Sequence, residues 1–352
     1  DQVFWGIYEA TLVTFIGFSY GGAVVSAILR LTHAQWRAPI TRMAEATALV
    51  TLLIGSSFAI IHLGHPERLW RFLVSPRISS PLVWDVLAIN TYLLATAIFL
   101  FLPLIPDMAI VRDRLTEERN APRWRRNLAS LLSLGWSGLP EQRRLLEWAT
   151  TVMSILIIPL AVTVHSVLSW AFAVTSRGGW HSTIFGPYFV VAALFSGVAM
   201  VILVVAGFRK WYHLEGLIEE KQIKYLGFIM ASLGIMYLYF TFSEFLTEGY
   251  NMTEEATPIL EALLLAQYAP LFWFWLIGTG VLPVVLVALP RTRTVPGLVV
   301  AAALVAGGMW LKRLMIVVPP LAMPLVKDTV WAWYRPSWVE ASVVLGATAA
   351  IP

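Results

Sequence analysis

Long apolar stretches alternate with short polar segments along the chain. A stretch of about 20 apolar residues is long enough for an α-helix to cross the hydrocarbon core of a bilayer. The pattern predicts eight spanning helices, at residues 3–30, 40–63, 81–105, 147–173, 185–208, 225–248, 265–289 and 296–318. A ninth apolar segment begins at residue 338 and stops too soon to span, and residue 1 lies almost directly in a helix. We therefore expect the sequence to be part of a longer polypeptide.

The composition supports an all-α integral membrane protein. Of the 352 residues, 58% are hydrophobic and only 13% are charged, whereas a soluble domain carries about 25% charged residues. The 16 Trp residues fit the aromatic belts at membrane interfaces. The chain has no Cys, which excludes iron–sulfur ligation and thiol catalysis within it. The basic residues are sorted by loop rather than gathered in one patch, so the net charge does not indicate nucleic acid binding.

The distribution of Lys and Arg orients the helices. The connections after the first, third, fifth and seventh predicted helices contain 17 of the 25 basic residues, and the opposite connections contain six. By the positive-inside rule the richer set is cytoplasmic and the amino end lies outside. We expect a multi-pass protein of the bacterial inner membrane.

The predicted cytoplasmic segment 106–146 is long for a plain connection. It mixes charged runs (RDRLTEER, RWRR and EQRR) with one apolar run, LASLLSLGW. One interpretation is an interfacial helix that lies on an anionic leaflet. The alternative is a docking surface for a cytoplasmic partner.

Five ionisable residues lie inside predicted apolar helices, and the topology places all of them toward the outer face. They are Glu9, His62, Asp85, His165 and Glu244. A charged group at membrane depth costs roughly 2.5–3.5 kcal/mol even on lenient insertion scales. Five such residues at one level predict a polar pocket, and the chemistry most natural to it is proton-coupled handling of a lipid-soluble substrate.

His62 and Asp85 are the predicted acid–base pair of this pocket. His62 closes the second helix and Asp85 opens the third after Pro81, so a short loop makes the two helices antiparallel neighbours. Quinol oxidation releases two protons and two electrons, and a site for it needs a titratable group near neutral pH. Histidine titrates there intrinsically, and burial brings a carboxylate toward that range.

Each of these residues also has a structural interpretation. His62 could bond a loop carbonyl, and Asp85 could interact with the dipole of its helix. His165 follows Pro159, whose kink leaves carbonyls that need partners. Glu9 and Glu244 could lie at the headgroups.

Glu45, at the cytoplasmic end of the second predicted helix, has two interpretations as well. It could lie at the interface or pair with Arg42. It could also form one end of a proton path.

Several segments carry a similarity to one family of membrane proteins. They are HLGHPERLWRFL (62–73), SPLVWDVLAINTYL (80–93), LPLIPDMAIVRDR (102–114), HSVLSWAF (165–172) and GWHSTIFGPYFVVAALFSG (179–197). In these motifs the chain resembles the NrfD/polysulfide-reductase membrane-subunit family, and most of all the quinol-binding membrane subunit of alternative complex III. The similarity is close over residues 62–200, and the eight-helix core fits throughout.

The resemblance implies a fold of two four-helix bundles. Residues 1–173 would form the first bundle with the quinol site, 174–318 the second, and 319–352 an outer loop and a partial ninth helix. It also implies that menaquinol or another quinone is the substrate and that this chain holds no metal or haem.

The implied partners include a periplasmic iron–sulfur subunit of the molybdopterin family, which exchanges electrons with the quinol. A multi-haem cytochrome c, further membrane subunits and lipid complete the set, and proton translocation is left open. The outer loop 176–187 would face the iron–sulfur subunit, with Trp180 and His181 as contact candidates. The alternative for these two is an aromatic anchor and a loop-capping histidine.

The first helix departs from the family pattern. The family often presents a His or Asn there, reaching toward the quinone, where this chain has Ser19 and Tyr20. Tyr20 can donate a hydrogen bond but does not titrate near pH 7. It could instead fill space beside Gly21 and Gly22 at a close helix contact.

Two other classes of protein remain open. A di-haem quinol subunit would need matched His pairs. His62 and His165 could supply one outer pair, but His33 and His213 lie in cytoplasmic connections. A secondary transporter would place ionisable groups at the midplane, whereas these lie toward one face. The direction of electron flow, the quinone type and the terminal acceptor cannot be predicted from the sequence.

Overall fold

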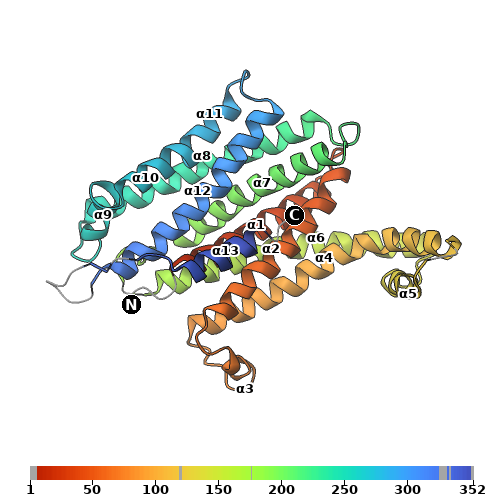
Figure 1. The fold of residues 1–352 in the computed structure, drawn as a ribbon, viewed down its shortest axis with the longest axis horizontal. Coiled ribbons are helices and arrows are strands. Elements are labelled where there is room, and N and C mark those ends of the chain that lie inside the picture. The colour runs from red at the N-terminus through yellow and green to blue at the C-terminus, as the bar shows by residue number, and fades with distance from the viewer. Residues whose placement is uncertain (1–5, 119–120, 176, 325–330, 333, 350–352) are drawn as a thin grey trace.

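The computed structural model describes residues 6–118, 121–175, 177–324, 331–332 and 334–349 (Figure 1). Eight helices among them are long and apolar enough to span a membrane, which confirms the all-α membrane fold. They are α1 (Gly6–Leu31), α2 (Ala38–Ile61), α4 (Pro81–Glu117), α6 (Pro140–Ala173), α7 (Phe185–Trp211), α8 (Glu220–Asn251), Ala269–Ala288, and α12 (Val295–Ala322). The seventh span consists of α10 (Ala269–Trp275), a π-helical turn η2 (Leu276–Val281) and α11 (Leu282–Ala288).

Five short helices complete the described chain. They are η1 (Pro66–Arg68), α3 (Arg71–Val74), α5 (Arg123–Leu132), α9 (Thr257–Leu264) and α13 (Trp338–Ala349). The loops that carry η1, α3 and α9 lie at one end of the long helices, and the α7–α8 loop and α5 lie at the other (Figure 1). This arrangement matches the predicted alternation of connections, and the two ends are called outer and cytoplasmic after that predicted topology.

The cytoplasmic segment is more helical than its hydropathy indicated. α4 continues to Glu117 through Pro103 and Pro106, and α6 already begins at Pro140. Hydropathy does not detect these extensions because charged residues interrupt their apolar positions. α5 lies between them, held to α4 by Arg112, which donates to the Ser133 hydroxyl at 3.2 Å and to the Trp136 carbonyl at 3.1 Å.

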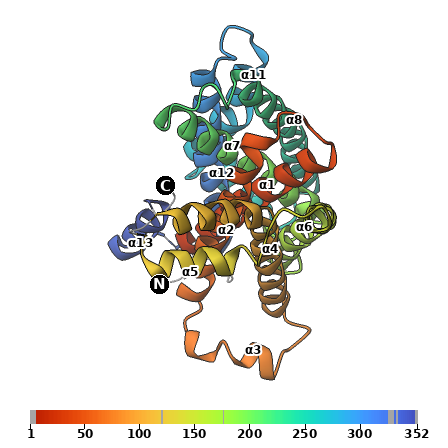
Figure 2. The ribbon, with the colours of Figure 1, turned by 90° about the vertical axis from the view of Figure 1, so that its right-hand side faces the viewer.

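α1 lies at the centre of the molecule and is buried along most of its length. It contacts α2, α6, α7 and α12, and Figure 2 shows α1 and α7 between α4 at one end and α8 and α11 at the other. Gly21 lies against the backbone of Gly197 of α7, and Gly22 against the Ala44 carbonyl of α2. Small residues permit this close approach between helices in a membrane, as predicted for the stretch beside Tyr20.

The buried apolar side chains form two clusters. One joins α1, α2, α4 and α6 with part of α7, and the other joins α7, α8, α10 and α12 with the cytoplasmic ends of α1 and α2. Because α1, α2 and α7 contribute to both clusters, the division into bundles at residues 173 and 318 remains a prediction.

The outer loop 174–184 is fastened to the end of α12. Pro320 has no amide hydrogen, so the Ile316 carbonyl has no helical partner; the Trp180 indole donates to it at 2.6 Å. Arg177 donates to the carbonyls of Pro320 at 2.6 Å and Met323 at 3.0 Å. Trp180 is only 8% exposed. The indole packs inward to cap this helix end, which favours a structural role for Trp180 over contact with a partner subunit.

The start of α1 is held from the other end of the chain. Tyr334 accepts a hydrogen bond from the Ile7 amide at 2.9 Å and donates one to Glu340 at 3.2 Å. Burial raises the pKa of the Tyr334 phenol to about 12, so its hydroxyl stays protonated at neutral pH and can donate.

Candidate functional site

Glu9 and His62 form an ion pair at the outer ends of α1 and α2. The His62 Nε2 lies 3.1 Å from the Glu9 Oε2, and the two side chains are 15% and 16% exposed. The other ring nitrogen, Nδ1, contacts the Phe58 carbonyl one turn earlier. A carbonyl only accepts, so Nδ1 carries a hydrogen, and a proton must also lie between Nε2 and the Glu9 carboxylate. The pair therefore holds one exchangeable proton.

Asp85, in the second turn of α4, is the third member of this outer cluster. It lies within electrostatic range of Glu9. Among the described residues, its buried Oδ1 has no hydrogen-bond partner. Buried polar atoms are usually bonded to protein or to something bound, so this oxygen is available to a ligand.

The outer cluster thus contains three of the six predicted site residues. The prediction of a His62–Asp85 pair needs revision, since the ion pair that orients His62 is with Glu9. Glu9 pairs with His62 and lies within electrostatic range of Asp85. This favours a position for Glu9 in the pocket over a position at the headgroups.

Tyr20 and His165 form a second, deeper group. Both are 1% exposed, and their rings lie 4.7 Å apart at 50°. Neither nitrogen of His165 has a hydrogen-bond partner of good geometry among the described residues. Pro159 has no amide hydrogen, so the carbonyl that it leaves without a helical partner is that of Ile155. Ile155 precedes His165 by ten residues, about 15 Å along the helix, so His165 does not cap that kink.

Glu244 belongs to a third group, away from the outer cluster, between α8 and α12. It accepts a hydrogen bond from Ser182 at 2.7 Å and lies within electrostatic range of Lys312. The structure therefore does not support the prediction that one pocket contains all six residues.

Lys312 and Arg313 are functional candidates that the sequence analysis missed. Both lie in the middle of α12 and are 7% and 4% exposed. The sequence did contain a signal for them. Of the 25 basic residues, 17 lie in the predicted cytoplasmic connections and six in the predicted outer connections, so the remaining two, Lys312 and Arg313, must lie inside a predicted helix. Buried cations in a membrane segment are costly and usually functional.

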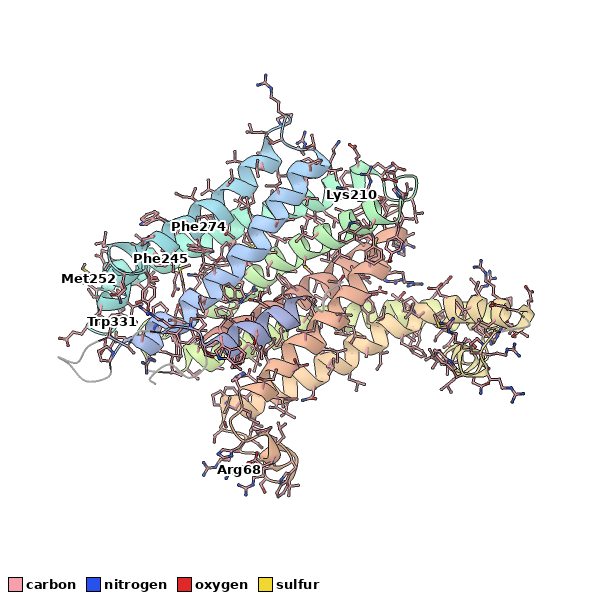
Figure 3. The ribbon with its side chains drawn as sticks, viewed as in Figure 1. Arg68, Lys210, Phe245, Met252, Phe274 and Trp331 are labelled. Carbon is pink, nitrogen blue, oxygen red and sulfur yellow. The ribbon has the colours of Figure 1, made fainter. Side chains whose placement is uncertain are left out.

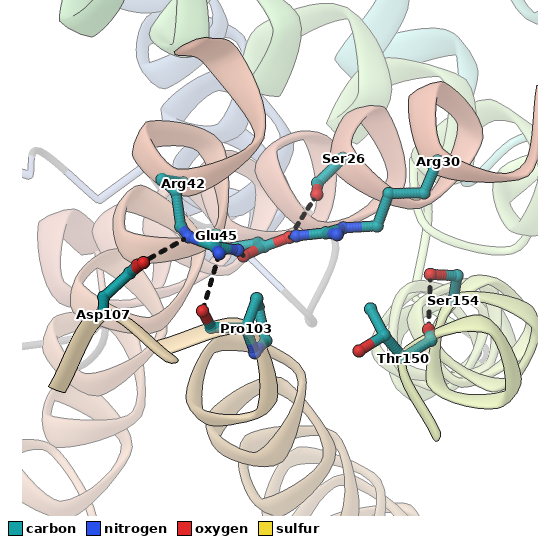
Figure 4. Close-up of polar contacts among 8 residues, drawn as sticks. All are labelled: Ser26, Arg30, Arg42, Glu45, Pro103, Asp107, Thr150 and Ser154. Carbon is teal, nitrogen blue, oxygen red and sulfur yellow. Dashed lines mark hydrogen bonds and ion pairs between the residues drawn. The ribbon is translucent and has the colours of Figure 1, made fainter. Parts of the chain in front are cut away.

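A fourth polar group lies at the cytoplasmic end of α1 and α2 (Figure 4). The Glu45 carboxylate is fully buried and lies 2.6 Å from Arg30 and 3.7 Å from Arg42. Ser26 donates to it at 2.5 Å. Its main partner is therefore Arg30, while Arg42 also lies 3.2 Å from Asp107.

This group borders a cavity of about 650 Å³ between α1, α2, α4 and α6. The polar lining includes Arg30, Arg37, Arg42, Glu147, Thr150 and Ser154. The cavity extends from the cytoplasmic end to the buried Ser154 of α6.

An apolar cavity of about 610 Å³ lies on the side of α1 that faces α12 and α13. Ile7, Phe18, Trp310 and Val344 contribute to its wall. Successive helix residues are about 100° apart, so Ile7 and Glu9 point in nearly opposite directions. This cavity is therefore separate from the outer cluster.

Metal ligation finds no support in the described ranges. They contain no group of three or more His, Cys, Asp or Glu side chains placed to hold a metal ion.

Comparison with known proteins gives consistent matches. A family model described as NrfD, polysulphide reductase, matches residues 1–324. A protein of Halobacterium salinarum named as a membrane subunit of dimethyl sulfoxide reductase is 25% identical, over 86% of this chain and 65% of its own length. The chain thus spans slightly less than two thirds of that relative.

Two further relatives match over most of the chain. A selenate reductase subunit of Mesobacillus selenatarsenatis is 27% identical, over 91% of this chain and 74% of its own length. The Hdr-like menaquinol oxidoreductase integral membrane subunit of Archaeoglobus fulgidus is 23% identical, over 92% and 72%.

Proposed function

Because the chain belongs to the NrfD polysulphide reductase family, we propose that it is the quinone-interacting membrane subunit of a multi-subunit oxidoreductase. The observation that carries the proposal is the outer cluster, where the proton-holding Glu9–His62 pair lies beside the unbonded Asp85 oxygen. The name of the archaeal menaquinol oxidoreductase relative supports menaquinol or another quinone as the substrate.

The chemistry follows from the residues of the outer cluster. Oxidation of a quinol releases two protons and two electrons, and reduction of a quinone takes up the same. Asp85 would act as the base that accepts a proton from a ring hydroxyl, and the His62–Glu9 pair would accept or supply the other. Tyr20 and His165 would extend the polar lining inward, and Glu244 would serve outside this cluster.

Purification of the intact complex tests this proposal. Organic extraction should release quinone in an amount comparable to that of this subunit, and the other subunits should include an iron–sulfur protein. A Soret band assigned to this chain would instead favour the di-haem alternative. Uptake of a solute by the reconstituted chain without a redox partner would favour the transporter.

Electrons must leave toward a partner, since the chain has no Cys to bind an iron–sulfur cluster. We place this partner, an iron–sulfur subunit of the molybdopterin family, on the arm of residues 62–80. The arm carries Arg68 at its tip (Figure 3) and exposes Trp70, Val74 and Ile78. His181, which is exposed in the next outer loop along the chain, remains a contact candidate, and a multi-haem cytochrome c would receive the electrons in turn.

The amino end is proposed to lie outside the inner membrane. Arg68 and Met252 lie at the proposed outer end, and Lys210 at the opposite end (Figure 3). The chain has no Cys, so single cysteines report the topology directly. Position 120 lies outside the described residues, but Ser130 of α5 and Met252, which lies at the proposed outer end away from the arm, are exposed. In spheroplasts, an impermeant maleimide should label Met252→Cys and spare Ser130→Cys until the membrane is opened; the reverse result would invert the topology.

Proton coupling is proposed through the cavity of about 650 Å³ at the cytoplasmic end, with Glu45 as the protonatable group that pairs with its lining residues Arg30 and Arg42. In proteoliposomes, Glu45→Gln should lower proton uptake per electron pair while quinone turnover persists. If proton uptake per electron pair were unchanged in this variant, the role of Glu45 would be limited to its ion pair with Arg30.

A further inference from the structure

A small cavity lies where α6, α7, α8 and α12 meet, and we call it the junction cavity. Its volume is about 20 Å³. Its polar lining consists of His165, Tyr188, Tyr237, Lys312 and Arg313. It therefore brings His165 of α6 together with the two buried cations of α12, Lys312 and Arg313.

Several polar atoms of the residues that line the junction cavity lack a well-formed hydrogen bond. Among the described residues, the two ring nitrogens of His165, the Tyr237 hydroxyl and the Arg313 Nη1 are buried without a hydrogen-bond partner of good geometry. The Arg313 guanidinium reaches Ser196 at 3.0 Å through Nη2, which uses one of its five donors. Gly17 leaves room for this guanidinium, because a Cβ there would collide with it.

The cavity has the size and the partners that a water molecule needs. A water requires about 10–15 Å³ of accessible volume and two to four polar partners, whereas 20 Å³ is too small for a quinone ring. Arg313 can only donate, a neutral His165 nitrogen can accept, and the Tyr237 hydroxyl can do either. Only a group that both accepts and donates satisfies all three, which is a property of water.

A second cavity continues from the first toward the outer face. It has a volume of about 50 Å³ and shares Lys312, Tyr188 and Ile316 with the junction cavity, and its lining adds Glu244 and Glu248. Glu248 lies within electrostatic range of His181, which is exposed in the outer loop. Polar groups thus follow one another from His165 to the outer surface.

Lys312 lies where the two cavities join. Its ammonium lies over the rings of Trp275 at 4.6 Å, Phe245 at 5.2 Å and Tyr188 at 5.8 Å. Aromatic faces stabilise a cation without taking its protons, so the ammonium hydrogens remain available to Glu244 on one side and to the junction cavity on the other.

We propose that an ordered water bound by His165, Tyr237 and Arg313 connects His165 to Lys312 and Glu244, and that this connection exchanges protons with the outer face. The Lys312 ammonium gives a proton to the Glu244 carboxylate and recovers one through the water from the His165 imidazolium. One proton leaves His165 and one reaches Glu244, and no electron moves. The water site stands independently of the proposed function, whereas the use of the protons rests on it.

The water is tested directly by a density map of the intact complex at a resolution that shows ordered waters. A peak is expected within hydrogen-bond distance of His165 and Arg313. Tyr237→Phe removes only the hydroxyl and should weaken or remove the peak, while Tyr239→Phe, two residues along α8 and 65% exposed, should leave it. A dry cavity in a map that resolves other internal waters would overturn the proposal, whether or not the complex turns over quinone.

The proton route is tested with two variants of one residue. Lys312→Met should slow proton release to the outer side by about 10²-fold or more, within the range of about 10²–10⁴-fold for loss of a positioned acid–base group. Lys312→Arg keeps the charge but does not give up its proton near neutral pH, so it should be slow as well. Lys224→Met, at a partly exposed site on α8 where the side chain pairs with Glu220, is the control. If Lys312→Met released protons at the wild-type rate, or if Lys312→Arg restored that rate in full, Lys312 would supply at most a positive charge.

Discussion

Asp85→Asn should lower quinone turnover by about 10²–10⁴-fold, the range typical for loss of a positioned general base. The amide has the same shape as the carboxylate, but it cannot accept a proton at neutral pH. The Asp85 Oδ1 has no partner among the described residues, so the substitution breaks no hydrogen bond that the structure shows for that atom. The complex should therefore assemble normally, and turnover should be measured on preparations that contain equal amounts of every subunit.

Asp113→Asn is the matched control for this substitution. Asp113 lies on the same helix, is 65% exposed and pairs only with the adjacent Arg112 among the described residues. Exposed ion pairs contribute little to stability, so turnover should stay near that of the wild type. If quinone turnover were similar in Asp85→Asn and Asp113→Asn, Asp85 would not be the base, and its carboxylate would only interact with the dipole of its helix.

Glu9→Gln and His62→Gln should each lower turnover by about 10²-fold, and the double variant should be no slower than the slower single variant. The reason is that the two side chains hold one proton between them, at 3.1 Å. Residues that act as a unit show strongly non-additive effects. Steady-state rates of the three variants complete a double-mutant cycle.

Additive losses would contradict this account of the pair. They would mean that Glu9 and His62 act separately and that their contact only stabilises the helix ends. Glu244→Gln provides a useful contrast, because Glu244 lies in a different polar group with Ser182. Its effect should add to that of Glu9→Gln.

The geometry of His62 also bears on the di-haem alternative. Its Nε2 lies against Glu9 and its Nδ1 against the Phe58 carbonyl. Both ring nitrogens are therefore engaged, and ligation of a haem iron would require one of these contacts to break.

The positions of the helices could be predicted from hydropathy because each span buries a continuous apolar stretch. All eight predicted spans are found. The extensions of α4 and α6 could not be predicted in this way, since charged residues continue those helices beyond the membrane. The π-helical turn η2 was also missed. Its Thr279 lies tightly against Gly308 of α12, and this contact between distant segments leaves no local signal.

The helices that carry the candidate site residues could be predicted, but the partners of these residues could not. Glu9, His62 and Asp85 lie on three helices, and their distances depend on how each helix is rotated about its axis. Sequence spacing fixes that rotation only between neighbouring residues. For the same reason the sequence did not separate Glu244 from the outer cluster, and Trp180 was expected at the surface although a proline in α12 gives its indole an inward acceptor.

The central claim is that quinone binds at the outer cluster, and photolabelling with an azido-quinone tests it most directly. After illumination of the intact complex, mass spectrometry of its peptides should find the label near the outer ends of α1, α2 and α4, and Asp85→Asn should reduce it. Label confined to α12 and α13, around the apolar cavity at Trp310 and Val344, and unchanged in Asp85→Asn, would contradict the claim.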